Sequence, residues 1–199
     1  MSHYYINDES LSKDTKELLV RIKYNDYKFL TMPGVFSKDG LDYGTKILLN
    51  NLFKEKGITK IADVGCGYGP IGLSLAKENP KATVYMYDIN ERSVELSKEN
   101  AKINNINNVE VFVNDGLDNI EEKFELIVTN PPIRAGKKTV FKIYEQAYNN
   151  LVDNGVLFIV IQRKQGAPSS FKKIQELFGN AEKVAQIAGY WVISARKNR

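Results

Sequence analysis

The sequence predicts an α/β fold in which a seven-stranded, mostly parallel sheet carries helices on both faces. From about residue 58 onward, apolar segments of strand length alternate with segments of helix length. Such an alternation produces right-handed crossovers and a parallel sheet. The last two apolar segments, 184–188 and 190–195, are joined only around Gly189. Because a crossover needs a longer connection, this last pair is expected to be antiparallel.

The chain before residue 58 is less regular. Its first part is polar and charged, with a short strand candidate at 24–30 that ends at the turn signal Met32-Pro33-Gly34. Apolar residues at helical spacing within 39–56 then predict a helix that Gly57 closes. We expect residues 1–38 to form an extension that packs on a main domain of residues 39–199.

The remaining elements follow the alternation. β-Branched and aromatic residues predict strands at 58–64, 83–87, 109–113, 124–129 and 156–161. Helices are expected from Pro70 to Glu78, from the cap Asn90 to about Asn104, from about Lys138 to Leu151, and from the cap Ser169 to Phe178.

Composition narrows the function classes. Charged residues make up 26% of the chain, a share typical of globular domains. No apolar run approaches the ~18 residues of a membrane span, and the N-terminus lacks a secretory signal pattern. Cys66 is the only cysteine and His3 the only histidine, so we expect no disulfide, metal centre or histidine-based catalysis. A cytoplasmic protein fits these features, and its net charge of +4 permits an anionic partner.

A glycine-rich turn follows the first strand of the alternation. The segment Asp63-Val64-Gly65-Cys66-Gly67-Tyr68-Gly69-Pro70 lets the backbone approach a ligand and turn into a helix that starts at proline. Its spacing is G-x-G-x-G, and Pro70 stands where a dinucleotide fingerprint needs glycine. Asp63 would repel a phosphate but could accept hydrogen bonds from a cationic amino-acid group. A tight turn without a ligand is the alternative interpretation.

Polar residues also end the next two strands. Asp88, followed by Ile89, could accept hydrogen bonds from both ribose hydroxyls of a nucleoside. Asn114-Asp115-Gly116 could place a carboxylate beside an adenine amino group. Taken singly, these residues also suit a helix start and a turn. Together they lie at the carboxyl edge of one sheet, where open α/β sheets bind ligands.

The fourth strand ends in Asn130-Pro131-Pro132-Ile133. Methyl transfer to an exocyclic aromatic amine needs two acceptors that hold its hydrogens and direct its lone pair at the electrophile. The side-chain oxygen of Asn130 and the carbonyl of Pro131 suit this task, and proline fixes the local backbone. No strong base is required, because the methylated amine becomes acidic.

This series of strand ends resembles the class I S-adenosylmethionine-dependent methyltransferases over about residues 58–195. The segment Pro33 to Gly44 (PGVFSKDGLDYG) is further similar to the one that precedes the catalytic domain of the ribosomal RNA small-subunit guanine-N2 methyltransferases, here as a small stand-alone relative. The resemblance implies a Rossmann-like fold, S-adenosylmethionine as cofactor, and catalytic Asn130, Pro131 and Pro132. The residues expected to bind the cofactor are Phe36, Asp63, Gly65, Cys66, Gly67, Gly69, Asp88, Ile89, Asn114, Asp115, Gly116 and Asn130.

The expected acceptor is a guanine amino group in RNA, in ribosomal RNA or a ribosomal subunit. Ile133 stands where well-known members carry an aromatic residue that can stack on the target base. Phe36 is the best alternative stacking residue, ahead of Tyr68 and Trp191. The expected substrate contacts are Ile133, Arg134, Lys137 and Lys138, and Lys142 belongs to the same basic group.

Three alternatives remain open on the sequence. A methyltransferase acting on a protein glutamine amide could use the same Asn-Pro-Pro geometry. A nicotinamide-nucleotide oxidoreductase would bind a different cofactor at the glycine turn. A catalytically silent RNA-binding module would keep the fold with a damaged motif, and both motifs are intact.

Overall fold

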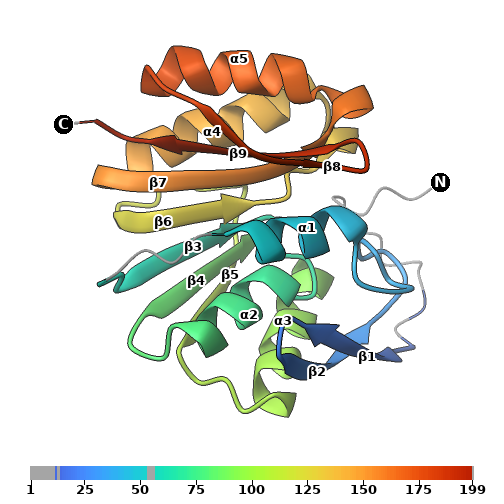
Figure 1. Ribbon diagram of the computed structural model, residues 1–199. Coiled ribbons are helices and arrows are strands. Elements are labelled where there is room, and N and C mark those ends of the chain that lie inside the picture. The colour runs from blue at the N-terminus through green and yellow to red at the C-terminus, as the bar shows by residue number, and fades with distance from the viewer. Residues whose placement is uncertain (1–11, 13, 53–56, 199) are drawn as a thin grey trace.

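The structure is a computed structural model that describes residues 12, 14–52 and 57–198 (Figure 1). Within these residues, a seven-stranded sheet has the order β5-β4-β3-β6-β7-β9-β8. Its strands are β3 (Lys60–Val64), β4 (Thr83–Asp88), β5 (Val109–Val113), β6 (Phe124–Thr129), β7 (Leu151–Gln162), β8 (Glu182–Ile187) and β9 (Tyr190–Arg196). The pairs among β3 to β7 are parallel, whereas β9 runs antiparallel to β7 and β8. The predicted sheet with one antiparallel strand is confirmed.

Helices cover both faces of this sheet, as predicted (Figure 1). One face carries α1 (Tyr43–Asn51), α2 (Pro70–Glu78) and α3 (Glu91–Ile103); the other carries α4 (Lys137–Asn150) and α5 (Ala167–Phe178). Two short 3-10 turns, η1 (Ile133–Ala135) and η2 (Arg163–Gln165), precede α4 and α5. No described helix is long and apolar enough to cross a membrane.

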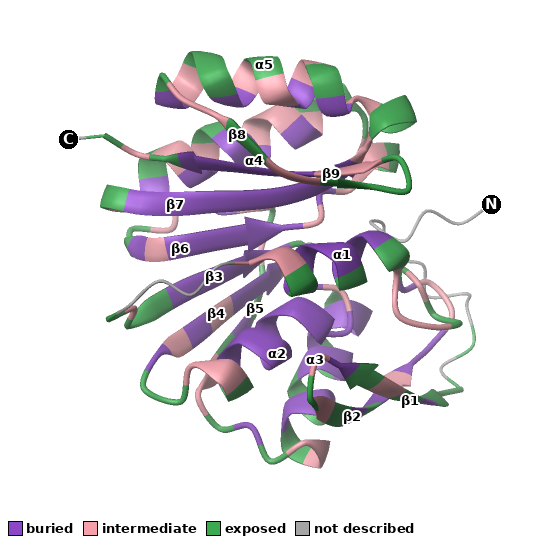
Figure 2. Ribbon diagram, viewed as in Figure 1, coloured by how far each residue is buried: buried purple, intermediate pink, exposed green. Residues whose placement is uncertain are grey.

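The core therefore has two layers, one on each side of the sheet. Successive residues of β3 alternate between them: Ile61 packs with the residues of α1 to α3, and Ala62 packs with those of α4 and α5. Central strands are buried on both faces (Figure 2). This double burial explains why 156–161 reads as an uninterrupted apolar run.

An N-terminal hairpin lies beside α3 and forms a separate two-stranded sheet (Figure 1). It pairs β1 (Lys16–Ile22) with β2 (Asn25–Thr31), so the predicted strand is present and β1 was missed. Asn100 ties the hairpin to α3, because its Oδ1 accepts from the Leu30 backbone N at 2.6 Å and its Nδ2 donates to the Leu30 carbonyl at 2.9 Å. Only one face of β1 is buried, which hid its strand pattern among charged residues.

Helix α1 begins later than the predicted segment, because Asp42 forms its N-cap. The Asp42 Oδ2 accepts from the Thr45 backbone N at 2.8 Å, which satisfies a donor that the helix itself cannot. Residues 53–56 of the predicted helix lie outside the described residues, as does His3.

Two further boundaries differ from the prediction. Leu151, the predicted end of a helix, and residues 152–155, which precede the predicted strand 156–161, belong to β7, which accommodates them through a register shift against β6. Gly166, not Ser169, precedes α5; the Ser169 hydroxyl donates to the Gly166 carbonyl at 3.0 Å and lies in the first turn of the helix.

Candidate functional site

The glycine-rich turn connects β3 to α2 and opens toward a cavity. Gly65, Gly67 and Gly69 all have positive φ angles, of 76°, 57° and 103°, which glycine adopts without strain. A Cβ at Gly65 or Gly67 would meet nothing within 4 Å, whereas one at Gly69 would lie 3.0 Å from the Leu73 side chain. The first two glycines therefore leave space for a ligand, and Gly69 allows close packing onto α2.

Asp63 lies behind this turn and not in the cavity. Its side chain is fully buried, and its Oδ2 accepts from the backbone N of Gly72, in the first turn of α2, at 2.8 Å. Among the described residues, Oδ1 has no hydrogen-bond partner. Burial, assisted by the nearby charge of Asp88, raises the pKa of Asp63 to about 7. The structure thus makes Asp63 a support of the turn, where the sequence predicted a direct contact with the cofactor.

Asp88, at the end of β4, both lines the cavity and supports the turn. Its Oδ2 accepts from the Gly67 backbone N at 2.8 Å, and its Oδ1 accepts from the Asn90 backbone N at 2.9 Å. Burial raises the pKa of Asp88 to about 6, although these two donors oppose the shift. Asp88 can therefore face a ligand in the cavity and also belong to the start of a helix, the two interpretations that the sequence left open. The helix start is formed by Asn90, which caps α3 by accepting from the Arg92 backbone N.

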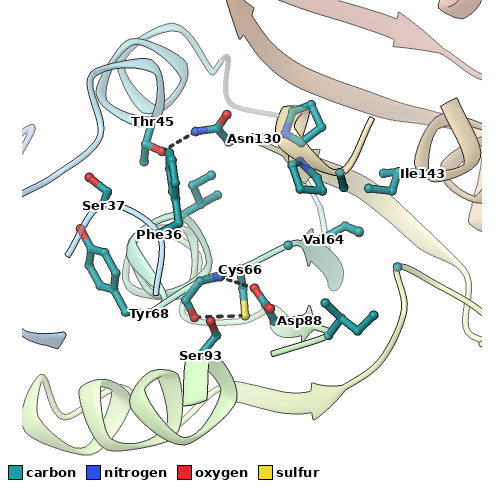
Figure 3. Close-up of a pocket in the computed structure, with 18 of the residues that line it drawn as sticks. Phe36, Ser37, Thr45, Val64, Cys66, Tyr68, Asp88, Ser93, Asn130 and Ile143 are labelled. Atoms are coloured by element: carbon teal, nitrogen blue, oxygen red, sulfur yellow. Dashed lines mark hydrogen bonds between the residues drawn. The ribbon is translucent and has the colours of Figure 1, made fainter. Parts of the chain in front are cut away.

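The cavity has a volume of about 260 Å³ and lies across the carboxyl ends of β3, β4 and β6. Figure 3 shows Asn130 and Thr45 on one side of it and Asp88, Cys66 and Ser93 on the other. The predicted site residues that line it are Phe36, Gly65, Cys66, Gly67, Asp88, Ile89, Asn114, Asp115, Gly116, Asn130, Pro131 and Pro132.

Asn130 follows β6 and is held by helix α1. Its Nδ2 donates to the Asp42 Oδ2 at 2.9 Å and to the Thr45 Oγ1 at 3.0 Å. The Pro132 carbonyl accepts from the Ala135 backbone N at 2.9 Å and closes the η1 turn. In the described part of the chain, neither the Asn130 Oδ1 nor the Pro131 carbonyl accepts a hydrogen bond, so both remain available as acceptors.

The segment 33–41, between β2 and α1, covers part of the cavity. The Asn90 Nδ2 donates to the Gly34 carbonyl at 2.9 Å, and the Tyr68 hydroxyl donates to the Gly40 carbonyl at 3.3 Å. These bonds hold Phe36, which is 36% exposed, at the cavity wall (Figure 3). Trp191 lies in β9 and does not line the cavity.

The predicted substrate contacts lie outside this cavity. Arg134 borders a second, more open hollow of about 550 Å³ that it shares with residues 34, 35 and 37–43. Lys137 and Lys138 are exposed at the start of α4, and Ile133 packs against the α4 and α5 core.

Lys142 differs from the prediction, because it pairs with acidic residues of its own chain. Its Nζ lies 2.7 Å from Asp115 Oδ2 and 2.5 Å from Asp118 Oδ2. These hydrogen bonds raise the pKa of Lys142. The ammonium is therefore committed to the loop after β5, and its partner Asp115 has one oxygen already engaged.

Several lining residues were missed from the sequence. Tyr68 was considered only as a base-stacking residue, although it lies inside the glycine turn. The cap signal at Asp42, just before the helix, could have identified that residue. Thr45, Ser93, Thr139 and Ile143 carry no local signal, because only the packing of α1, α3 and α4 brings them to the cavity.

Comparisons with known proteins agree with this geometry. The profile of the methyltransferase small domain matches residues 26–194. The chain is 44% identical over 197 residues to "Uncharacterized protein YbxB" of Bacillus subtilis (strain 168), covering 98% of each chain. It is 33% identical over 184 residues to ribosomal RNA small subunit methyltransferase C of Citrobacter koseri, covering 90% of this chain and 52% of the relative.

Among solved structures, the chain resembles the T. Thermophilus 16S rRNA N2 G1207 methyltransferase (RsmC) in complex with AdoMet and guanosine. The TM-score is 0.82 at 27% identity, over 95% of this chain and 51% of that one. The chain thus spans about half the length of these two RsmC proteins. It belongs to the methyltransferase small domain family and, with it, to the S-adenosylmethionine-dependent methyltransferases.

Proposed function

We propose that the protein methylates the exocyclic amino group of guanine in RNA, with ribosomal RNA or a ribosomal subunit as the acceptor. The observation that carries this proposal is the pair of available acceptor oxygens, on Asn130 and Pro131, beside the glycine-turn cavity. The similar structure from T. Thermophilus is described as an N2 G1207 methyltransferase and holds guanosine.

The cavity residues fit S-adenosylmethionine. Each oxygen of Asp88 accepts one backbone N–H, and a carboxylate oxygen has room for a further donor, here a ribose hydroxyl. The open backbone at Gly65 and Gly67 suits the methionine portion. Asn114, Asp115 and Gly116 would hold the adenine, and Phe36, also in the cavity wall, would cover the cofactor.

Catalysis in this proposal comes chiefly from orientation. When bound, the cofactor supplies an electrophilic methyl group on a sulfonium. Asn130 Oδ1 and the Pro131 carbonyl accept the two hydrogens of the guanine amine and so direct its lone pair along the line of transfer. Apolar side chains of the cavity wall, among them Val64, Ile71 and Ile143, would exclude water from the sulfonium, while the amine stays near the open side of the cavity. The methylated amine then loses a proton to solvent, so no side chain has to act as a strong base.

The RNA contacts in this proposal lie at the rim. Arg134, Lys137 and Lys138 follow the Asn-Pro-Pro motif on η1 and α4, where cations can hold the phosphates that flank the target. We also propose the division expected from the sequence, with 1–38 as an extension and 39–199 as the methyltransferase domain. The separate β1–β2 sheet supports this division.

The test is to incubate the protein with labelled S-adenosylmethionine and, in parallel, total RNA, ribosomal subunits or protein extract. We expect label in RNA and N2-methylguanosine as the modified nucleoside by mass spectrometry. The Asn130→Ala variant is the control and should not transfer the label. Label in protein glutamine, or in a different nucleoside, would contradict the assigned acceptor, and undiminished turnover by Asn130→Ala would contradict the assigned role of Asn130.

A further inference from the structure

The side-chain amide of Asn130 has no hydrogen left to donate. An Asn Nδ2 carries two hydrogens, and here one donates to the Asp42 Oδ2 at 2.9 Å and the other to the Thr45 Oγ1 at 3.0 Å. Both acceptors belong to the start of α1, and they are 88 and 85 residues away in the sequence. Asn130 can therefore offer a bound molecule only its oxygen.

Asp42 also decides which way the amide is turned. An ionised carboxylate can accept hydrogen bonds but cannot donate them. A rotated amide would place the Asn130 oxygen against the Asp42 oxygen, and the two would repel each other. Asp42 is itself held by the Thr45 backbone N at 2.8 Å, and the Thr45 side chain is buried with the residue only 3% exposed. The acceptors are thus fixed before any substrate arrives.

We propose that Asp42 and Thr45 are positioning residues for methyl transfer, because they hold both N–H groups of Asn130 and leave only Oδ1 for the acceptor amine. This inference rests on the proposed function. An amine presents two N–H donors, and an amide that turned its own N–H groups toward them would repel the amine. The two hydrogen bonds to Asp42 and Thr45 therefore keep Asn130, in the free protein, in the orientation with Oδ1 available to the amine. Neither Asp42 nor Thr45 needs to touch the reacting atoms.

The first test compares two changes at Thr45. Thr45→Val keeps the shape but removes the hydroxyl, and we expect kcat to fall about 10-fold, the effect of one lost hydrogen bond. The KM for RNA and the affinity for S-adenosylmethionine should not change. Thr45→Ser restores a hydroxyl and should recover most of the lost kcat. Equal loss in Thr45→Ser and Thr45→Val, or normal kcat in Thr45→Val, would overturn the inference.

A matched control is available at Thr31. This threonine of β2 is also buried, and its hydroxyl has no hydrogen-bond partner among the described residues. Thr31→Val therefore removes a buried hydroxyl without breaking a bond, and kcat should stay at the wild-type value. A fall in kcat equal to that of Thr45→Val would mean that any buried Thr→Val change lowers kcat by weakening the packing of the fold, without a specific effect on Asn130. That result would overturn the inference.

The second test uses Asp42→Ser. Serine is also a good N-cap residue, so α1 keeps its start while the acceptor for Asn130 is lost. Because the lost bond is to a charged group, we expect kcat to fall about 10- to 100-fold. Thermal unfolding then separates a role in catalysis from a role in stability alone. A lower melting temperature with normal kcat would mean that the hydrogen bonds of Asn130 to Asp42 and Thr45 only stabilise the fold, and would overturn the inference.

The third test observes the amide directly, without turnover. In the ligand-free protein, the two side-chain N–H protons of Asn130 should exchange slowly with solvent in NMR spectra, and faster in Thr45→Val. Fast exchange in the wild type would overturn the inference. If the wild type methylates an acceptor other than guanine, the proposed function fails and the Thr45 comparison is made on that acceptor. If Asn130→Ala loses activity while Thr45→Val and Asp42→Ser do not, only the inference fails.

Discussion

The two halves of the cavity are built in different ways. The half at β3 and β4 is held by bonds within one strand–helix–strand unit, such as the one from the Gly72 backbone N to Asp63. The half at β6 is held by bonds between segments far apart in the chain, as between Asn130 and Asp42. In the first half carboxylates support the backbone, and in the second a carboxylate orients a neutral amide.

This difference separates two tasks. The β3–β4 half contains buried carboxylates with raised pKa values, so its properties should depend on pH. The β6 half depends on the direction of an amide and on the packing of α1 against the end of β6. Changes in the first half should therefore affect cofactor affinity and stability, whereas changes in the second should affect the rate of transfer.

The largest expected effect is that of Asn130→Ala on the rate. Loss of a preorganised acceptor should lower kcat about 10³-fold, because the amine is no longer directed at the methyl group. Calorimetric titration with S-adenosylmethionine should show that much of the wild-type affinity is kept, because the other residues of the cavity wall are unchanged. A large loss of cofactor affinity in this variant would show that the two halves do not have separate tasks.

The next effect concerns stability and pH. The folded-state pKa of Asp63 is raised to about 7 from 3.8, so the folded protein binds this proton more tightly than the unfolded chain. Its stabilising contribution is complete below pH 3.8 and is lost as the pH rises through about 7. At about 1.4 kcal/mol per pKa unit, this shift from 3.8 to about 7 should lower the free energy of unfolding by about 4 kcal/mol over the whole range.

Asp63→Asn tests this assignment, since it keeps an acceptor for Gly72 and removes the charge. Urea unfolding at pH 5 and pH 8 should show the wild type losing stability relative to the variant as the pH rises. Parallel changes in the two proteins would mean that Asp63 does not carry the buried charge.

A smaller effect is expected on cofactor affinity. Ionised Asp88 is the form that accepts from ribose hydroxyls, and its pKa is about 6 in the free protein. Affinity for S-adenosylmethionine should be complete above pH 7 and about 10-fold weaker at pH 5. Asp88→Asn should bind more weakly at neutral pH with a flat profile between pH 5 and pH 8, and a profile as steep as that of the wild type would exclude Asp88 as the titrating group.

The smallest effects are expected among the basic residues outside the cavity. Arg134 is proposed to contact an RNA phosphate, whereas the Lys142 ammonium is already paired with Asp115 and Asp118. Arg134→Ala should raise the KM for RNA and reduce its salt dependence, because a phosphate contact is lost. Lys142→Ala breaks partly exposed ion pairs, so it should lower the free energy of unfolding by less than about 1 kcal/mol. Its KM for RNA should not change, and an increase as large as that of Arg134→Ala would restore Lys142 as an RNA contact.

The carboxyl edge could be predicted from the sequence because each strand end is a local signal. Gly65, Gly67, Asp88 and Asn130 directly follow or end apolar runs, and parallel strands bring such ends together. The placement of Asp63 behind the turn could not be predicted, because that placement depends on which face of β3 it occupies. The pairing of Lys142 with Asp115 joins α4 to the loop after β5, and no spacing in the sequence encodes it.

The sequence by itself determined the order of strands and helices, the parallel sheet and the edge at which the polar motifs meet, since periodicity and turn residues act over a few neighbouring positions. Only the tertiary structure decided how α1 meets the end of β6. The orientation of the Asn130 amide follows from that contact, because two acceptors more than 80 residues away fix it through packing, on which local periodicity has no influence.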